Sequence, residues 1–294
     1  MHPRLRTVVG AFAAALCAVG LIACGQPQAA AEKAADTVAV FSREDGSGTR
    51  SAFAELVGLQ QKAADGTPVD LTANDAVITN STSVMLTSVA NDPAAIGYVS
   101  MGSLTDAVRA LAIDGVEATP ANVKSGAYKL ARPLNFVTKK DLSPAAQDFL
   151  AFAASAEGQT VAEKAGYVSA ATGKPFASNG AQGKVVVAGS SSVSPVAEKI
   201  AEAFKQANPN VSVEIQTSDS TTGIALCADG TADVGMASRE LADSESAKGL
   251  SASPVALDGI AVIVPPSQTV TGLTTQQVRD LFAGDVTSWS AVRG

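Results

Sequence analysis

Apolar and polar residues follow two periods along this chain, one typical of strands and one typical of helices. Residues 211–215 (VSVEI) alternate with a period of two, as in a strand with one buried face. Residues 256–264 (ALDGIAVIV) are almost continuously apolar, as in a strand buried on both faces. Residues 274–282 (TTQQVRDLF) have a helical pattern with a capping threonine, and Gly284 follows as a stop.

The two periods alternate along most of the chain, which predicts an α/β fold. Further strands are predicted at residues 37–41, 95–100, 108–113 and 184–188. Further helices are predicted around Phe53, Leu56 and Val57, after Ser143-Pro144, and around Ile200, Ala203 and Phe204.

The start of the chain has the layout of a secretory signal. A basic segment precedes an apolar stretch at residues 8–21, which is too short to span a bilayer as a stable helix. Leu-Ile-Ala-Cys24-Gly follows and resembles the bacterial lipobox, whose cysteine becomes lipid-modified. We expect a signal peptide at 1–23, lipidation of Cys24 and a tether at 24–36. An ordinary signal peptide cut nearby, or an uncleaved anchor, is the alternative.

The histidine and cysteine content and the net charge limit the reactions and partners that this chain can have. The single histidine, His2, lies in the signal, which removes Ser-His-Asp and Cys-His catalysis and the usual zinc sites. We therefore expect no catalytic residue, no metal and no cofactor. Of the three cysteines only Cys227 remains in the body, so no internal disulfide is expected. The net charge of −7 argues against nucleic acid or an anionic membrane as partner, but not against a local anion site.

Several predicted strand-to-helix junctions are rich in glycine and hydroxyl side chains. A helix start presents unpaired N–H groups and a partial positive charge, and Ser or Thr hydroxyls add donors. Any one junction taken alone is better explained by ordinary capping and turn preferences. Several of them in one chain, with an arginine beside one, indicate an oxyanion site. The junctions are residues 43–49 (REDGSGT), 189–192 (GSSS) and 218–223 (SDSTTG).

These loops resemble those of the phosphate-binding proteins that serve bacterial phosphate (Pst) ABC transporters. Residues 43–49 match that family's Arg-x-x-x-Ser-Gly-Thr signature, and similar segments extend from residue 37 to residue 294. The resemblance implies a two-lobed α/β fold of the type II periplasmic-binding-protein class, with phosphate between the lobes. The implied phosphate ligands are Arg43, Ser47, Gly48, Thr49, Ser191, Ser192, Ser220, Ser238, Arg239 and Asp258.

One position departs from the family pattern. Some members have an aspartate directly after the serine that matches Ser238, and it accepts a proton from bound phosphate, which excludes fully ionised sulfate. This chain has Arg239 there. Asp258 or Asp45 could replace that acceptor. Sulfate, molybdate or another tetrahedral oxyanion is therefore the alternative ligand.

The order of the motifs also departs from the family, in which the glycine-serine loop comes first and the arginine loop later. Here the later half comes first, which predicts a circular permutation. Residues 167–184 would join the family's old termini as a linker. One lobe would be continuous at 132–257, and the other would be assembled from 37–131 and 258–294. The alternative is two partial copies joined by an assembly or gene-model error.

The resemblance implies a monomeric, extracytoplasmic protein, bound to the membrane only through its lipid, that delivers inorganic phosphate to ABC permease subunits. A sensor or scavenger with the same fold is a second possibility. A serine phosphatase using Ser47 is a third, although Gly46-Ser47-Gly48 is one residue short of a Gly-x-Ser-x-Gly elbow.

Overall fold

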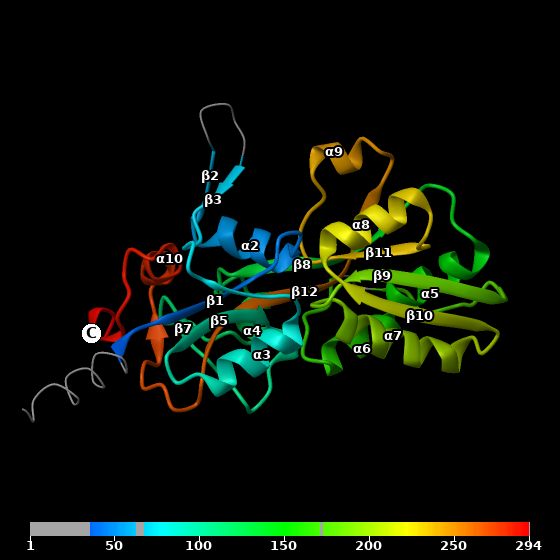
Figure 1. Ribbon diagram of the computed structural model, residues 1–294. Coiled ribbons are helices and arrows are strands. Elements are labelled where there is room, and N and C mark those ends of the chain that lie inside the picture. Colours follow the sequence, from blue (N-terminus) through cyan, green and yellow to red (C-terminus); the bar gives the residue numbers. More distant parts are fainter. Residues whose placement is uncertain (1–35, 63–67, 171–172, 294) are drawn as a thin grey trace, which may run out of the picture. The chain divides into compact units, whose positions relative to one another are not determined.

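Helices and strands alternate in the computed structural model, which describes residues 36–62, 68–170 and 173–293 (Figure 1). The strands are β1 (Ala39–Arg43), β2 (Gln60–Lys62), β3 (Pro68–Asp70), β4 (Val77–Thr79), β5 (Ala95–Ser100), β6 (Arg109–Ala110), β7 (Ala112–Ile113), β8 (Ala131–Thr138), β9 (Gly183–Ser190), β10 (Val211–Ser218), β11 (Val234–Ala237), β12 (Ser251–Val264) and β13 (Gly272–Leu273). The α-helices are α2 (Gly48–Leu56), α3 (Thr82–Asn91), α4 (Pro120–Lys124), α5 (Pro144–Ala153), α6 (Ala156–Lys164), α7 (Ser194–Ala207), α8 (Ser220–Asp229), α9 (Asp243–Ser246) and α10 (Thr275–Ala283). The 3₁₀ helices are η1 (Met101–Ser103) and η2 (Trp289–Ala291). The predicted α/β class is confirmed.

One strand, β12, connects the two parts of the main sheet. The sheet order is β10-β9-β11-β8-β12-β5-β1-β4, with β6 also paired to β12. The first part of β12 pairs antiparallel with β8 as far as Gly259, and from Ile260 onwards it pairs with β5. Its residues are buried from Asp258 to Val264, as the continuous apolar pattern predicts.

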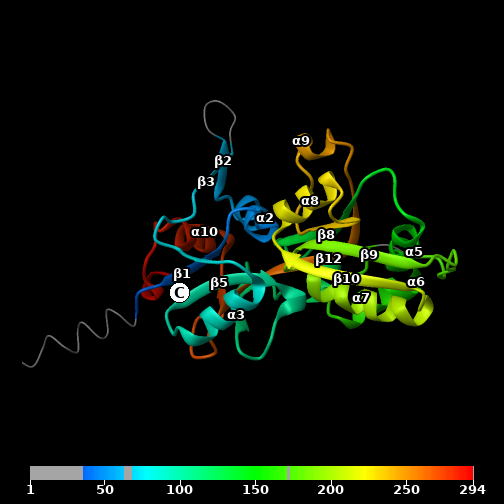
Figure 2. The same cartoon turned by 45° about the vertical axis from the view of Figure 1, so that its right-hand side comes forward.

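Each part of the sheet has its own core. We call the predicted ranges 37–131 and 258–294 the split lobe, and 132–257 the continuous lobe; these boundaries stay predictions. In the split lobe Phe53 stacks on Tyr98 with ring centroids 4.0 Å apart. In the continuous lobe Phe149 packs against Phe204 at 5.6 Å, with α5, α6 and α7 on one side of the strands and α8 on the other (Figure 2). Removing such a buried ring costs about 3–5 kcal/mol.

The predicted strand at 108–113 is divided in two. Residues 109–110 form β6, which pairs antiparallel with β12, while residues 112–113 form β7, which pairs parallel with β13. Because the two halves pair with different strands, the apolar pattern predicts their burial but not their separation. No helix within the described part of the chain is long and apolar enough to cross a membrane.

The segment predicted as a linker between old termini is packed against the continuous lobe. Phe176 meets Phe152 edge to face at 5.1 Å. The buried carboxylate of Asp148 accepts hydrogen bonds from Ser178 Oγ and Asn179 N, both at 2.8 Å. This segment is therefore held by specific contacts; residues 173–182 have no regular secondary structure, and β9 begins at Gly183.

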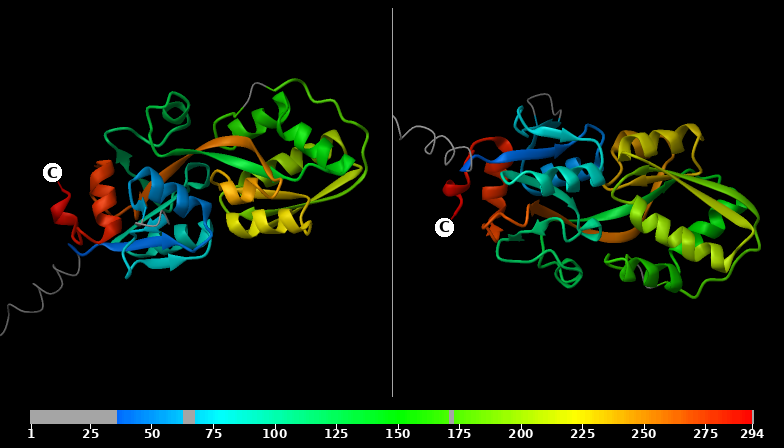
Figure 3. Two further views of the ribbon diagram at one scale, coloured as in Figure 1. Left: turned by 90° about the horizontal axis from the view of Figure 1, so that it is seen from above. Right: turned by 60° about the horizontal axis from the view of Figure 1, so that its bottom comes forward.

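The two ends of the described body lie side by side (Figure 3). Thr37 forms an antiparallel bridge with Ser288, and Val38 N donates to Thr287 O at 2.9 Å. Ser290 N donates to Asp36 Oδ1 at 2.8 Å. The residues just before β1 are thus hydrogen-bonded to η2 and to the residues that lead into it.

Candidate oxyanion site

Four helix starts meet where the two lobes face each other. In the split lobe the parallel strands β1 and β4 are followed by α2 and α3. In the continuous lobe the parallel strands β9 and β10 are followed by α7 and α8. The carboxyl ends of parallel strands are where ligands bind in open α/β sheets, because the following helices present free N–H groups there.

Arg43 ends β1 and is 1% exposed. Its Nε and Nη2 donate to the two carboxylate oxygens of Glu44, each at 2.7 Å. Nη2 also donates to Ser191 Oγ in the continuous lobe at 3.1 Å. Glu44 thus fixes the guanidinium plane, and one of its edges faces the opposite lobe.

Buried hydroxyl groups continue the network from both lobes. Thr49 Oγ1 lies 2.7 Å from Ser192 Oγ and 3.5 Å from Ser238 Oγ. Ser220 Oγ lies 3.3 Å from Ser238 Oγ and accepts from Ser238 N at 3.0 Å. A hydroxyl donates one hydrogen bond and accepts up to two, so this group of side chains can surround either a deprotonated or a protonated oxygen. We call Arg43, Thr49, Ser191, Ser192, Ser220 and Ser238 the hydroxyl cluster.

Gly48 is the first residue of α2 and marks a close approach of the lobes. A Cβ atom at this position would lie 2.4 Å from Ser220 Oγ and 2.8 Å from Ser238 Oγ. Any side chain here would therefore displace these two hydroxyls or hold the helix start away from the opposite lobe. The neighbouring Ser47 caps α2, since its hydroxyl accepts from Arg50 N at 3.3 Å.

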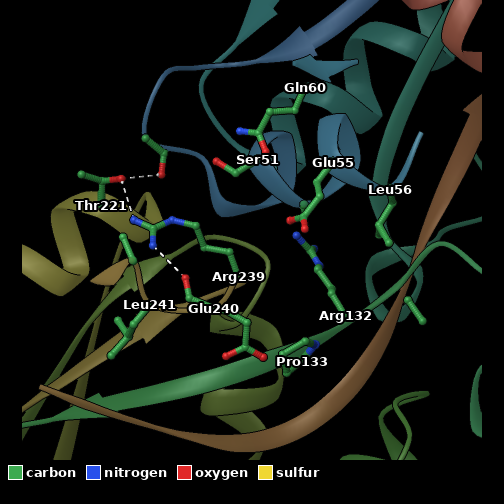
Figure 4. Close-up of a pocket in the computed structure, with 14 residues that line it drawn as sticks. Ser51, Glu55, Leu56, Gln60, Arg132, Pro133, Thr221, Arg239, Glu240 and Leu241 are labelled. Atoms are coloured by element: carbon green, nitrogen blue, oxygen red, sulfur yellow. Dashed lines mark hydrogen bonds between the residues drawn. The ribbon is translucent and has the colours of Figure 1, made fainter. Parts of the chain in front are cut away.

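Arg239 lies outside the hydroxyl cluster. Its guanidinium donates to both carboxylate oxygens of Glu245, at 2.8 Å each. It also donates to Thr221 Oγ1 at 3.2 Å (Figure 4). These hydrogen bonds lower the pKa of the Glu245 carboxyl. Thr221 in turn donates from its N and Oγ1 to Gly46 O in the split lobe, at 3.1 and 3.2 Å. We call Gly46, Thr221, Arg239 and Glu245 the clasp.

The clasp borders a groove of about 590 Å³ whose walls come from both lobes (Figure 4). Helix α2 supplies Ser51 and Glu55, and the segment after β11 supplies Glu240 and Leu241. The start of β8 lines the same groove at Arg132.

Asp258 is fully buried beside Arg132, its register partner on β8. The two side chains are 3.4 Å apart between Nη2 and Oδ2, and Arg132 Nη1 donates to Ser238 O at 3.0 Å. Burial raises the pKa of Asp258, an effect that Arg132 opposes. Asp258 is therefore connected to the hydroxyl cluster through Arg132. Asp45, the other candidate acceptor, is exposed and pairs with Arg50 at 2.8 Å.

Two hydroxyl side chains that were not among the predicted ligands join these hydrogen bonds. Ser190 Oγ donates to Ser238 Oγ at 3.0 Å. Thr82, at the start of α3, lies 3.2 Å from Ser191 and 3.3 Å from Ser192. The signal for Thr82 is the run Thr79-Asn-Ser-Thr82 after a short apolar stretch, which has the same strand-cap-helix order as the other loops. Among the described residues no cluster of three or more His, Cys, Asp or Glu side chains could hold a metal.

Two lobes on crossing strands, with helix starts and buried hydroxyls between them, define a binding protein of the PBP superfamily. The family model described as a PBP superfamily domain matches residues 23–157 and 174–294. Phosphate-binding protein PstS 2 of Streptococcus agalactiae is 50% identical over 277 residues, covering 94% of each chain. This chain belongs to the family of phosphate-binding proteins PstS.

Two further comparisons describe the range of similarity. The crystal structure of a phosphate-binding protein of a phosphate ABC transporter from Streptococcus pneumoniae is 42% identical, with a TM-score of 0.69. That match covers 87% of this chain and 100% of the other. Phosphate-binding protein PstS of Pseudomonas aeruginosa is 32% identical over 126 residues, covering 38% of this chain and 39% of that protein.

Proposed function

We propose that this chain captures inorganic phosphate between its two lobes and delivers it to the permease of a phosphate ABC importer. The observation that carries the proposal is the convergence of Arg43 and Thr49 from one lobe on Ser191 and Ser192 from the other. A guanidinium and several hydroxyl donors, all withdrawn from water, suit a tetrahedral oxyanion. The names of the streptococcal relatives support phosphate as that anion.

The geometry is compatible with phosphate within the class of tetrahedral oxyanions. Phosphate at neutral pH carries at least one proton, which needs an acceptor, whereas sulfate carries none. The serine and threonine oxygens of the hydroxyl cluster can accept as well as donate. We therefore propose that hydroxyls take the role of the family's aspartate, whose place is occupied by Arg239.

The geometry favours binding over catalysis. In the proposed role Ser47 is a helix cap: its own backbone N donates to Glu44 O at 3.2 Å, and the backbone N–H groups of Gly48 and Thr49 at the start of α2 border the anion. Its hydroxyl oxygen already accepts a hydrogen bond from Arg50 N, which suits a structural role better than a nucleophilic one. Turnover of a chromogenic phosphate ester by the purified protein would reverse this assignment.

Location and chain order complete the proposal. Lipidation of Cys24, which lies outside the described residues, would hold a monomeric binding protein at the outer face of the membrane. The streptococcal relative matches along 94% of both chains, which supports a genuine order of halves rather than a joining error. The Pseudomonas relative matches over 38% of this chain, as a rearranged order would give.

Titration calorimetry of residues 26–294, after unfolding and refolding to remove carried-over ligand, tests the proposal. We expect one phosphate per chain, and Arg43→Ala should weaken binding by at least about 100-fold because it removes charge-assisted hydrogen bonds. Arg279→Ala, which removes an equal charge from the partly exposed side of α10, is the matched control. Tighter binding of sulfate or molybdate than of phosphate would assign the site to another oxyanion, and no binding by the folded protein would reject it.

A further inference from the structure

Thr82 connects the split lobe to the first loop of the continuous lobe. It is 5% exposed and is the first residue of α3, a helix of ten residues capped by Ser81. Its Oγ1 accepts from Arg43 Nη1 at 3.4 Å and lies 3.3 Å from Ser192 Oγ. Its backbone N donates to Ser191 Oγ at 3.3 Å. Thr82 therefore contacts three members of the hydroxyl cluster.

These contacts fix the direction of the Ser191 hydroxyl. Ser191 Oγ accepts from Arg43 Nη2 and from Thr82 N, so both of its lone pairs face N–H donors. Its own hydrogen is then left to donate, either to Thr82 Oγ1, 3.2 Å away, or to an anion between the lobes. Thr82 Oγ1 is polarised in the same way, because it accepts from the Arg43 guanidinium.

We infer that Thr82 is a direct ligand of the bound anion and that the start of α3 is a fourth binding element beside the three loops that the sequence motifs identify. The inference rests on the proposed function. Two helix starts from each lobe then surround the anion, α2 and α3 against α7 and α8. Since Thr82 touches Ser191 and Ser192, it adds a hydroxyl beside the loop that follows β9.

The test compares Thr82→Val and Thr82→Ala, which remove the hydroxyl, with Thr82→Ser, which keeps it. Phosphate affinity by calorimetry should fall roughly 10- to 100-fold in the first two variants and stay within about threefold in the third. Thr87→Val, on an exposed position of the same helix, is the matched control and should bind normally. A cooperative thermal transition without phosphate should show that every variant folds, while the phosphate-induced rise in Tm should shrink only when the hydroxyl is lost.

The outcomes separate this inference from the proposed function. Wild-type affinity in Thr82→Val and Thr82→Ala, with binding abolished by Arg43→Ala, would overturn the role of Thr82 and leave phosphate binding intact. Equal losses in Thr82→Ser and Thr82→Val would also overturn it, because shape and not the hydroxyl would then matter. If wild-type protein binds no phosphate, the inference falls together with the function on which it rests.

Discussion

The hydroxyl cluster carries little net charge, so anion binding there depends on the placement of individual donors and on the small size of Gly48. The hydroxyl cluster holds one guanidinium, which a neighbouring carboxylate already neutralises, and its other side chains are uncharged. Burying an anion among such groups relies on short, directed hydrogen bonds from both lobes. The fit therefore depends on how closely the lobes approach, and Gly48 sets that limit.

Gly48→Ala should weaken the approach of the two lobes around the anion without affecting folding. Alanine is favourable at the start of a helix, so the split lobe should fold normally. In the arrangement seen here the new Cβ would lie 2.4 Å from Ser220 Oγ and 2.8 Å from Ser238 Oγ, so either these hydroxyls turn away from the site or the lobes stay further apart. Phosphate affinity by calorimetry should fall by roughly 100-fold or more, while far-ultraviolet circular dichroism and the Tm without phosphate should change little. An affinity close to wild type would mean that the bound form is more open than this structure.

The sequence predicts the residues of this site better than their roles. The side chains that meet as the motifs imply each end or follow a strand and lie before or within the first turn of a helix; they are Arg43, Thr49, Ser191, Ser192, Ser220 and Ser238. Thr82 was not predicted as a site residue, because a threonine after a short, exposed strand gives only a local capping signal. Arg239 and Asp258 show the opposite limit, because their positions in the motifs do not reveal the partners, Glu245 and Arg132, toward which the fold turns them.

At the scale of elements, the clasp connects the start of α8 to the loop before α2. Gly46 adopts φ 86°, which favours glycine, and a Cβ there would lie 2.6 Å from Asp219 Oδ1. Its carbonyl receives both hydrogen bonds of Thr221, whose hydroxyl accepts from Arg239. We propose that Arg239 stabilises the closed arrangement through Thr221, and the alternative is that it contacts the anion directly.

Glu245→Gln distinguishes these two roles, because it weakens the hold on the Arg239 guanidinium. If Arg239 acts through Thr221, phosphate release measured by stopped flow should become roughly 3- to 10-fold faster. If Arg239 binds the anion, the freed guanidinium should slow release instead. Glu202→Gln, in the exposed pair with Lys199 on α7, is the control and should leave release unchanged.

The contribution of the Arg239–Glu245 pair to stability depends on pH. Arg239 lowers the pKa of folded Glu245 below the ordinary 4.5, so near that pH the unfolded chain binds the proton more readily. The contribution of the pair to stability is therefore complete above the unfolded pKa and is lost as the pH falls through the lower folded value. The difference in free energy of unfolding between wild type and Glu245→Gln should shrink over that acid range, and a constant difference would contradict the assignment.

Elements were easiest to predict where burial follows a simple period. The alternating and continuous apolar runs place β10, β12 and α10 well, and α10 ends at Gly284 with φ 78°. The division between β6 and β7 depends on which strand each half pairs with, and that is a long-range property. Local periodicity carries no signal for it.

At the scale of the molecule, the order of the halves and the path of the chain fit together. The described ends are hydrogen-bonded through Asp36 and Ser290, and the segment that would join the family's old termini is anchored by Phe176 and Asp148. Two cores built on one sheet need both crossing strands, β8 and β12, but not a particular starting residue. The same fold should therefore form from chains that begin at different residues, provided that the new termini do not interrupt β8 or β12.

A re-permuted chain tests this independence. It would start at Gly173, run to Arg293, pass through a short glycine-serine linker to Asp36 and end at Ala170. Because the joined ends are adjacent, closing the new loop should change the free energy of unfolding by only about 1–2 kcal/mol, and phosphate affinity should stay within about threefold. A control permutant opened between Gly259 and Ile260, where β12 passes from β8 to β5, should fail to fold because it cuts the strand that both cores share. Failure of both chains would show that the order of the halves is itself required for folding. Success of the first chain alone would show that the packing of the elements determines the fold and that their order along the chain does not.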